Sequence, residues 1–139
     1  MVCTFIGHRD APWDLREKLE SVITDLIVNK KVDLFYMGNH GNFDRMAYQV
    51  VRKLKAMYTH IEYYMVIAYL SPTMAEAGEN TLFPQDLEFV HPRNAITARN
   101  KWMIDNSEIL VSYVVCDFGG AAKIKRMAEK RGKTVINLK

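Results

Sequence analysis

The chain contains few cysteines, and their placement excludes the usual cysteine-based sites. Only two of its 139 residues are cysteine, Cys3 and Cys116, and each lies within an apolar run. Zinc sites and redox motifs require cysteine or histidine at short, regular spacing, and no two histidines of this chain are spaced to bind a metal from one helix. We therefore expect no metal and no other cofactor. The two cysteines should instead be small buried hydrophobic residues of a protein in a reducing compartment.

Long apolar runs and leader sequences are also missing. No stretch approaches the roughly 20 apolar residues of a membrane-spanning helix, and the first residues, MVCTFI, lack the basic start of a signal peptide. We therefore expect no membrane association and a cytoplasmic location.

The chain has no large excess of charge of one sign. Its formal net charge is +3, and its lysines and arginines are interspersed with acidic residues. Nucleic-acid-binding domains usually carry a basic stripe, and the basic residues between 123 and 131 are more typical of a solvated helix face. We therefore expect nucleic acid to be an unlikely partner.

What the chain does have is the composition and alternating pattern of a globular α/β protein. It is 49% hydrophobic and 25% charged, which predicts a single domain over residues 1–139. Apolar runs predict strands at 2–6, 32–37, 61–70, 109–116 and 134–138, and helical periodicity falls between them, with a long connection over 71–94. Strands alternating with helices predict a Rossmann-like three-layer sandwich with a mostly parallel sheet of about five strands.

Three glycine-containing segments follow predicted strands directly, at residues 7–10, 38–44 and 117–120. Because the carboxyl ends of parallel strands meet at one edge, these segments should converge there. Glycine permits close backbone approach, and the N–H groups at helix starts attract anions, so the set predicts a phosphate-binding site that includes Gly7, Gly38, Gly119, Gly120 and Ala121. Neither GxGxxG nor a Walker A sequence is present, and the alternative is that these glycines only form tight turns.

Charged residues beside the first junction favour an anionic ligand. Arg9 can bind a phosphate or carboxylate through two N–H groups, or else form a salt bridge with Asp10 or Asp14. His8 is a candidate acid or anion contact, although a histidine in this place is also typical of a hydrogen-bonded structural group.

The second junction holds more polar residues than a helix start requires. Asn42 or Asp44 can cap the following helix, but additional polar side chains nearby favour contacts to a ribose or base, so the predicted ligand-binding residues are Asn39, His40, Asn42, Phe43 and Asp44. Asp44 is also the candidate catalytic acid or base if a reaction occurs.

Arg99 falls on the apolar face of a predicted helix, one turn from Ala95 and Met103. An arginine there needs a partner, either Asp105, Glu108 or an anion of the ligand. We include Arg99 and the adjacent Asn100 among the ligand-binding residues.

Four segments together, FIGHR at 5–9, FYMGNHGNFD at 35–44, ARNKWMI at 98–104 and FGGAAK at 118–123, resemble the SLOG superfamily of Rossmann-like domains and, within it, the YpsA/YoqJ-like group of bacteria and prophages. The superfamily includes LOG phosphoribohydrolases, DNA-binding DprA proteins and sensors of nucleotide-derived signals. The resemblance thus implies a nucleotide-like ligand. Arg99 resembles the arginine of the LOG Arg-Lys pair, and Gly119-Gly120 resembles the glycine pair of the LOG PGGxGTxxE loop.

The chain departs from the LOG pattern at the catalytic glutamate. Lys123 or Ile124 falls near that position, and the next carboxylate is Glu129. A lysine cannot stabilise an oxocarbenium-like transition state, so we favour binding or sensing of a nucleotide or nucleotide-derived ligand, by a homo-oligomer. The alternative is an N-glycosidase, phosphoribohydrolase or deoxyribosyltransferase-like enzyme in which Asp44 supplies the carboxylate, and the sequence leaves open whether the ligand is turned over.

Overall fold

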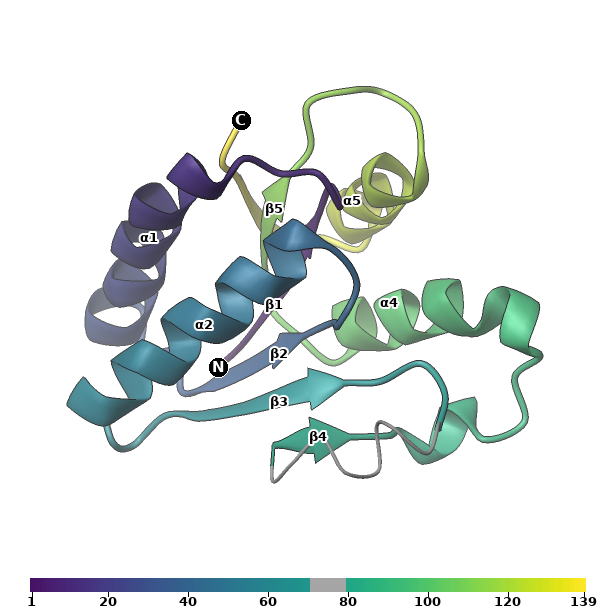
Figure 1. Ribbon diagram of the computed structural model, residues 1–139, viewed down its shortest axis with the longest axis horizontal. Helices are drawn as coiled ribbons and strands as arrows, with labels where there is room; N and C mark the ends of the chain where they lie inside the picture. Colours follow the sequence, from purple (N-terminus) through teal and green to yellow (C-terminus); the bar gives the residue numbers. More distant parts are fainter. Residues whose placement is uncertain (71–79) are drawn as a thin grey trace.

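A parallel β-sheet forms the centre of the protein. The structure is a computed structural model and describes residues 1–70 and 80–139. The six strands of the sheet run in the order β4-β3-β2-β1-β5-β6 (Figure 1), and every neighbouring pair is parallel. The strands are β1 (Val2–Gly7), β2 (Leu34–Met37), β3 (Glu62–Val66), β4 (Thr81–Leu82), β5 (Ile109–Tyr113) and β6 (Thr134–Asn137). The predicted Rossmann-like fold is confirmed, with six strands in place of about five.

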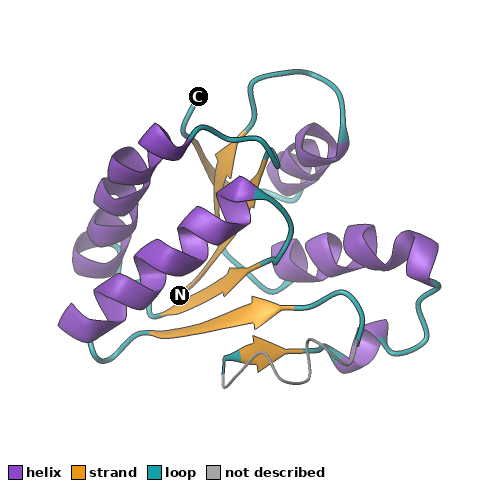
Figure 2. Cartoon of the chain, in the orientation of Figure 1, coloured by secondary structure: helices purple, strands orange, loops and turns teal. Residues whose placement is uncertain are grey.

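Helices cover both faces of this sheet (Figure 2). On one face lie α1 (Arg16–Asn29), which follows the short 3-10 helix η1 (Trp13–Leu15), and α2 (Asn42–Met57). On the other face lie α4 (Ala95–Asp105) and α5 (Gly120–Lys130), and two more 3-10 helices, η2 (Gln85–Leu87) and η3 (Pro92–Asn94), precede α4. The first two helices of the chain thus cover one face and the last two cover the other, as in doubly wound α/β folds.

The central strand β1 shows how the sequence builds two cores. Successive side chains of a strand point to opposite faces, and Cys3 and Phe5 pack among residues of α1 and α2, whereas Ile6 packs among residues of α4 and α5. The buried hydroxyl of Thr4 donates a hydrogen bond to the carbonyl of Tyr36 at 2.9 Å. Burial on both faces explains why this strand is almost uniformly apolar.

The long connection predicted over 71–94 contains β4 and the two 3-10 helices η2 and η3. The N–H of Ile67 donates to the carbonyl of Leu82 at 2.9 Å, which joins β4 to β3. A strand of two residues has no measurable side-chain period, so its sequence gives no signal. Residues 71–79 of this connection, with Pro72 and Gly78, lie outside the described residues.

Strand β5 ends three residues earlier than predicted, because the backbone groups that follow it form hydrogen bonds with side chains instead of with a neighbouring strand. The amide of Asn137 accepts the N–H of Val114 at 2.9 Å and donates to its carbonyl at 3.0 Å. Cys116 therefore lies in the loop after the strand and is only half-buried, contrary to the prediction, while Cys3 is fully buried as expected.

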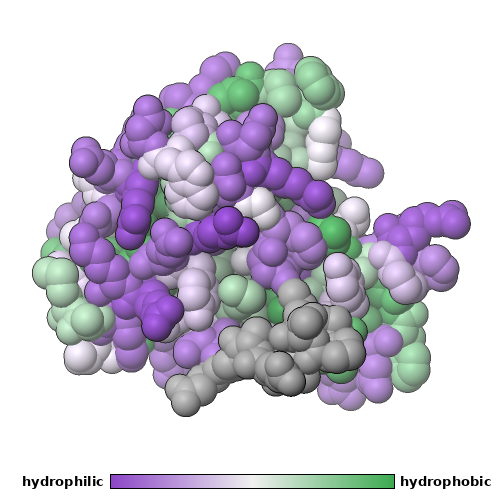
Figure 3. Space-filling model, in the orientation of Figure 1, coloured by the Kyte–Doolittle hydropathy of each residue, from purple (hydrophilic) through white to green (hydrophobic). Residues whose placement is uncertain are grey.

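Hydrophilic side chains predominate on the face formed by α1 and α2. Figure 3 shows apolar side chains there only as small separate patches, because residues such as Met46, Val50 and Leu54 of α2 point inward. Within residues 1–70 and 80–139, no helix is long and apolar enough to cross a membrane.

Candidate functional site

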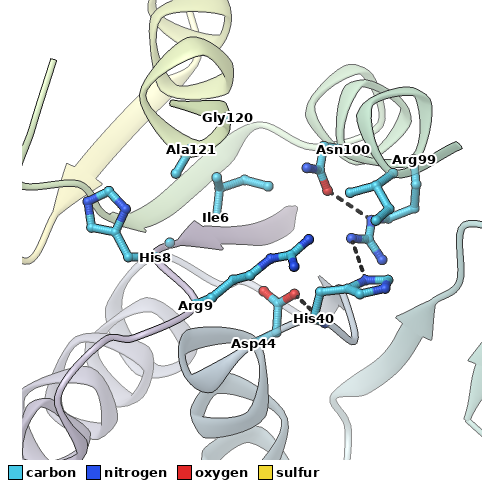
Figure 4. Close-up of a pocket in the computed structure, with 11 residues that line it drawn as sticks. Ile6, His8, Arg9, His40, Asp44, Arg99, Asn100, Gly120 and Ala121 are labelled. Atoms are coloured by element: carbon cyan, nitrogen blue, oxygen red, sulfur yellow. Dashed lines mark hydrogen bonds between the residues drawn. The ribbon is translucent and has the colours of Figure 1, made fainter. Parts of the chain in front are cut away.

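A pocket of about 330 Å³ opens at the carboxyl edge of the sheet, beyond β1 and β5 (Figure 4). The chain leaves β1 through α1 toward β2 on one side, and leaves β5 through α5 toward β6 on the other. Open α/β sheets bind their ligands at such a switch point. The lining residues are Ile6, Gly7, His8, Arg9, His40, Asp44, Ile96, Arg99, Asn100, Gly120 and Ala121.

Arg99 of α4 is almost completely buried, with 1% of its surface exposed. Its Nε donates to the amide oxygen of Asn100 at 2.8 Å, and one terminal nitrogen donates to the carbonyl of Val66 and the amide oxygen of Asn39, both at 3.0 Å. The other terminal nitrogen lies 3.3 Å from Nδ1 of His40. The guanidinium thus joins α4 to the end of β3 and to the loop after β2.

The two protein partners that the sequence predicts for Arg99 are wrong. Asp105 instead forms an ion pair with Arg131, and the carboxylate of Glu108 accepts the N–H of Val2 at 2.7 Å. Helical period places Arg99 on the inward face correctly, but it cannot identify which distant loop meets that face.

Asp44 of α2 is the buried carboxyl group of the pocket, with 8% of its surface exposed. Its Oδ2 accepts the backbone N–H of His40 at 3.0 Å. Burial raises the pKa of Asp44 to about 6, against the opposing effects of the Arg99 charge, the His40 N–H and the Arg9 charge. A carboxyl group that titrates near neutral pH is suited to proton transfer.

Gly38 leaves the space that these two charged side chains occupy. A Cβ atom here would lie 2.6 Å from Oδ2 of Asp44 and 2.9 Å from Cζ of Arg99. Both distances are too short for real contacts, so a larger residue would displace the carboxylate or the guanidinium. Gly38 does not line the pocket itself, but it determines where two of the lining groups lie.

His40 is held in its neutral form between cations. Burial lowers the pKa of His40, and the charges of Arg99 and Arg9 lower it further. Because Nδ1 faces an N–H donor of Arg99, that nitrogen acts as the acceptor and the proton is assigned to Nε2. His40 can therefore offer one N–H donor to a ligand.

Arg9 supplies the free positive charge of the pocket. Its guanidinium extends from the end of β1 to the centre of the pocket, toward the groups around Asp44 and Arg99 (Figure 4). Within residues 1–70 and 80–139, the structure gives this side chain no hydrogen bond and no ion pair, so the alternative of a salt bridge with Asp10 or Asp14 is not observed. An exposed, unpaired arginine pointing into a pocket is available to bind an anion.

The backbone under Arg9 is fixed by the loop that precedes α2. The N–H of Asn42 donates to the carbonyl of Arg9 at 2.8 Å, and its side-chain amide donates to the carbonyl of Ala11 at 3.2 Å. Gly41, at φ +91°, packs so closely that a Cβ would lie 2.5 Å from Cα of Arg9. Neither Asn42 nor Asp44 caps α2 with its side chain, contrary to the default expectation for a helix start.

His8 connects the pocket to the loop after β5. Its Nε2 accepts the N–H of Val115 at 3.0 Å, and its ring packs edge-on against Tyr113. The structural alternative for His8 is therefore observed, although the residue also lines the pocket.

The amino end of α5 forms the remaining wall. Gly119 is its N-cap at φ +94°, and no side chain caps the helix. Gly120 and Ala121 line the pocket, and nothing lies within 4 Å of the Cβ position of either Gly119 or Gly120. Uncapped N–H groups beside open space are a favourable environment for an anion.

Most of the residues predicted for the site line this pocket, and the others support it. Gly7, His8, Arg9, His40, Asp44, Arg99, Asn100, Gly120 and Ala121 line it directly. Five predicted residues do not: Gly38, Asn39, Asn42, Phe43 and Gly119. Phe43 packs over Gly7, whose Cβ position lies 2.4 Å from its ring. Sequence reasoning missed Ile6 and Ile96 because apolar residues at a strand end or helix start look like core residues.

Two solved structures have the same fold. DNA processing protein A from Helicobacter pylori, a structure described for its mode of binding single-stranded DNA, matches with a TM-score of 0.69 and 17% identity over 99% of this chain and 64% of that one. DNA processing protein A (DprA) from Streptococcus pneumoniae matches with a TM-score of 0.69 and 14% identity over 97% of this chain and 49% of that one. This chain thus spans less than two thirds of each, and the likeness supports a DprA-related fold. No protein-family model and no curated protein sequence matches the chain.

The prediction that nucleic acid is an unlikely partner is wrong, because the H. pylori protein, which shares this fold, binds single-stranded DNA. The prediction relied on a net charge of +3, which averages the whole chain, and on the interpretation of the basic residues between 123 and 131 as a solvated helix face. Binding depends instead on where the cations lie, and Arg9 and Arg99 meet in one pocket.

Proposed function

We propose that the pocket binds a nucleotide, with its phosphate between Arg9 and the amino end of α5. The observation that carries this proposal is the Arg9 guanidinium, which reaches the centre of the pocket without a partner among the described residues. A phosphate there would receive charge-assisted hydrogen bonds from Arg9 and from free helix N–H groups. The volume of about 330 Å³ falls in the range of small-ligand pockets.

The rest of the pocket suits the sugar and base. The Nε2–H of neutral His40 can donate to an acceptor, and the free carboxyl oxygen of Asp44 can accept a ribose hydroxyl. Ile6 and Ile96 supply apolar contact. The same nucleotide chemistry is offered by a free nucleotide and by a unit of single-stranded DNA, and binding of the latter is supported by the shared fold of the H. pylori protein.

The test is a thermal-shift screen of nucleoside monophosphates including dTMP, cyclic nucleotides, ADP-ribose and the oligonucleotide dT12, followed by titration of the hits. A ligand that binds only the folded state raises the melting temperature. A monophosphate hit shows that the pocket binds a single nucleotide unit, and stabilisation by dT12 alone shows that binding requires a strand.

Replacing Arg9 with alanine is expected to weaken binding of every hit by roughly 10- to 100-fold, about 1.5–3 kcal/mol, because the charge-assisted contacts to the phosphate are lost. Titration calorimetry measures the affinity, and circular dichroism checks the fold. Arg52→Ala, at an exposed arginine on α2, is the control and should bind like the parent. Unchanged affinity of Arg9→Ala would place the phosphate elsewhere.

Hydrolysis of the nucleotide's N-glycosidic bond is a second candidate function, favoured by Asp44. The buried carboxyl lines the pocket and its pKa is raised to about 6, so at neutral pH it can accept a proton from water or support a developing positive charge on the sugar. Oδ2 already accepts the N–H of His40, which leaves Oδ1 for this role.

The enzyme and the binding module differ in their response to Asp44→Asn. If Asp44 is catalytic, release of free base falls by orders of magnitude in the variant while nucleotide binding survives, because the charge is lost and the shape kept. Chromatography of the products measures this release. Base release by the parent that Asp44→Asn leaves unchanged would contradict the catalytic role, and nucleotide binding by the parent without release would support the binding module.

We also propose that the chain is a member of the YpsA/YoqJ-like group within the SLOG superfamily. The support is the set of four segments that resemble the group, because each of them contributes pocket residues. Segments 5–9, 35–44 and 98–104 supply the charged and polar lining, and segment 118–123 supplies Gly120 and Ala121.

A further inference from the structure

An exposed aromatic residue precedes the end of α5 that lines the pocket. Phe118 lies in the loop between β5 and α5, two residues before the pocket-lining Gly120, and 76% of its surface is exposed. Its carbonyl accepts the thiol of Cys116 at 3.3 Å, which involves only the backbone of Phe118. The ring is therefore free to stack against a planar group outside the pocket.

A basic hollow begins on the next turn of α5. It has a volume of about 360 Å³ and is lined by Lys123, Arg126, Met127, Lys130 and Arg131. Positions 123, 126, 127 and 130 recur at steps of three and four residues, which places them on one face of the helix, while Ile124 and Ala128 are buried on the opposite face. We call Phe118 and the cations Lys123, Arg126 and Lys130 the α5 strip.

Two of the three carboxylates near the cations of the α5 strip are paired with other residues. Asp105 binds Arg131 and Glu129 lies 3.5 Å from Lys125, whereas the carboxylate of Asp117, beside Phe118, forms no ion pair within residues 1–70 and 80–139. Within residues 1–70 and 80–139, neither Lys123 nor Lys130 has an ion pair.

Arg126 extends the strip back toward the pocket. One terminal nitrogen of its guanidinium donates to the carbonyl of Asp117 at 2.8 Å, which brings positive charge beside Phe118. Gly120 at the pocket and Lys123 on the strip are three residues apart on α5, so they share a face. Phe118, the pocket-lining Gly120 and the cations at positions 123, 126 and 130 therefore follow one another along the chain within about three turns of helix.

We infer that the α5 strip binds single-stranded nucleic acid that enters the nucleotide pocket with one unit and continues along α5. This inference rests on the proposed nucleotide function of the pocket. The base next to the bound nucleotide stacks on Phe118, and the following phosphates contact Lys123, Arg126 and Lys130. An aromatic platform combined with a basic groove is the arrangement that recognises single strands, whereas a paired duplex would not present a base to the ring.

The test compares dT12 with dTMP on the same protein, by fluorescence anisotropy and competition. We expect the parent to bind dT12 at least about tenfold more tightly than dTMP, because only the oligonucleotide reaches the strip. The double variant Lys123→Glu with Lys130→Glu is expected to lose at least about tenfold in affinity for dT12, while dTMP binding stays within about twofold. The salt dependence should also fall, by about 1.4 in the log–log slope for two lost phosphate contacts.

Phe118→Ala separates stacking from charge. It is expected to weaken dT12 binding by about 5- to 100-fold, with an unchanged salt slope, because stacking on an aromatic ring does not release counterions. The matched control is Lys30→Glu with Arg52→Glu, which makes the same change in net charge at exposed residues of the opposite face. It should bind dT12 nearly as the parent does.

Several outcomes would overturn the inference. Equal affinity of the parent for dT12 and dTMP would show that the strip contributes nothing, and the nucleotide function would stand. Equal losses in the strip variant and in its charge control would indicate a general charge effect, and equal competition by polyglutamate would indicate an unselective anion surface. Binding of neither dT12 nor any mononucleotide would instead refute the proposed function of the pocket.

Discussion

Between pH 3 and pH 8, the free energy of unfolding of Asp44→Asn is expected to rise by about 3 kcal/mol relative to that of the parent. The pKa of Asp44 is about 6 in the folded chain, against 3.8 for an unperturbed aspartate, and each pKa unit corresponds to about 1.36 kcal/mol. Because the folded state binds this proton more tightly, the stabilisation is fully present below pH 3.8 and is lost as the pH rises through 6. Asparagine does not titrate in this range, so the stability of the variant does not fall in this way as the pH rises.

Chemical denaturation of parent and variant at each pH measures the difference. His40 titrates with the opposite sign, because its lowered pKa favours the neutral form on folding, but it is present in both proteins and largely cancels. Asp33→Asn is the control: the N-terminal ammonium lowers the pKa of Asp33, so this exposed carboxylate stabilises the fold slightly as the pH rises. A parent and an Asp44→Asn variant with parallel pH profiles would show that burial of Asp44 costs no stability.

Gly41→Ala is expected to destabilise the protein by about 2–6 kcal/mol and to abolish nucleotide binding. Gly41 has φ +91° and ψ −179°, a conformation that residues with a Cβ strongly avoid, at a cost of about 1–3 kcal/mol. The new Cβ would also lie 2.5 Å from Cα of Arg9, and such overpacking adds about 1–3 kcal/mol. Displacement of this backbone moves the guanidinium that the phosphate requires.

Gly119→Ala separates the two causes. Gly119 has nearly the same backbone conformation, φ +94° and ψ 175°, and is also a helix N-cap, but nothing lies within 4 Å of its Cβ position. Only the conformational cost of about 1–3 kcal/mol should therefore appear. Thermal and urea unfolding without ligand measure both variants, and equal losses would rule out the contact with Arg9 as a source of stability.

The sequence predicted the fold and the position of the pocket because both depend on local patterns. An apolar run such as 2–6 followed by glycine indicates a buried strand and the turn after it, and parallel strands bring all such turns to one edge. Arg99 could be assigned to the inward face from its spacing to Ala95 and Met103 alone. These inferences need no knowledge of distant contacts.

The remaining details depend on contacts between distant segments. Asn137 ends β5 by binding both backbone groups of Val114, although the two residues are far apart in sequence. The partners of Arg99 likewise come from the end of β3 and the loop after β2. The role of Gly38 also depends on distant segments, because this glycine leaves room for side chains from two different helices.

Arg99 also has a consequence for how the native protein opens. Its hydrogen bonds attach α4 to Val66 and to the loop that carries Asn39 and His40. If α4 separates from the sheet, the buried guanidinium loses all of these hydrogen bonds at once. The free-energy cost therefore opposes the opening of the helix and of the loop alike. Amide protons of α4 and of the loop after β2 should therefore exchange with solvent as one cooperative unit, so that the pocket is either complete or absent and does not loosen one wall at a time.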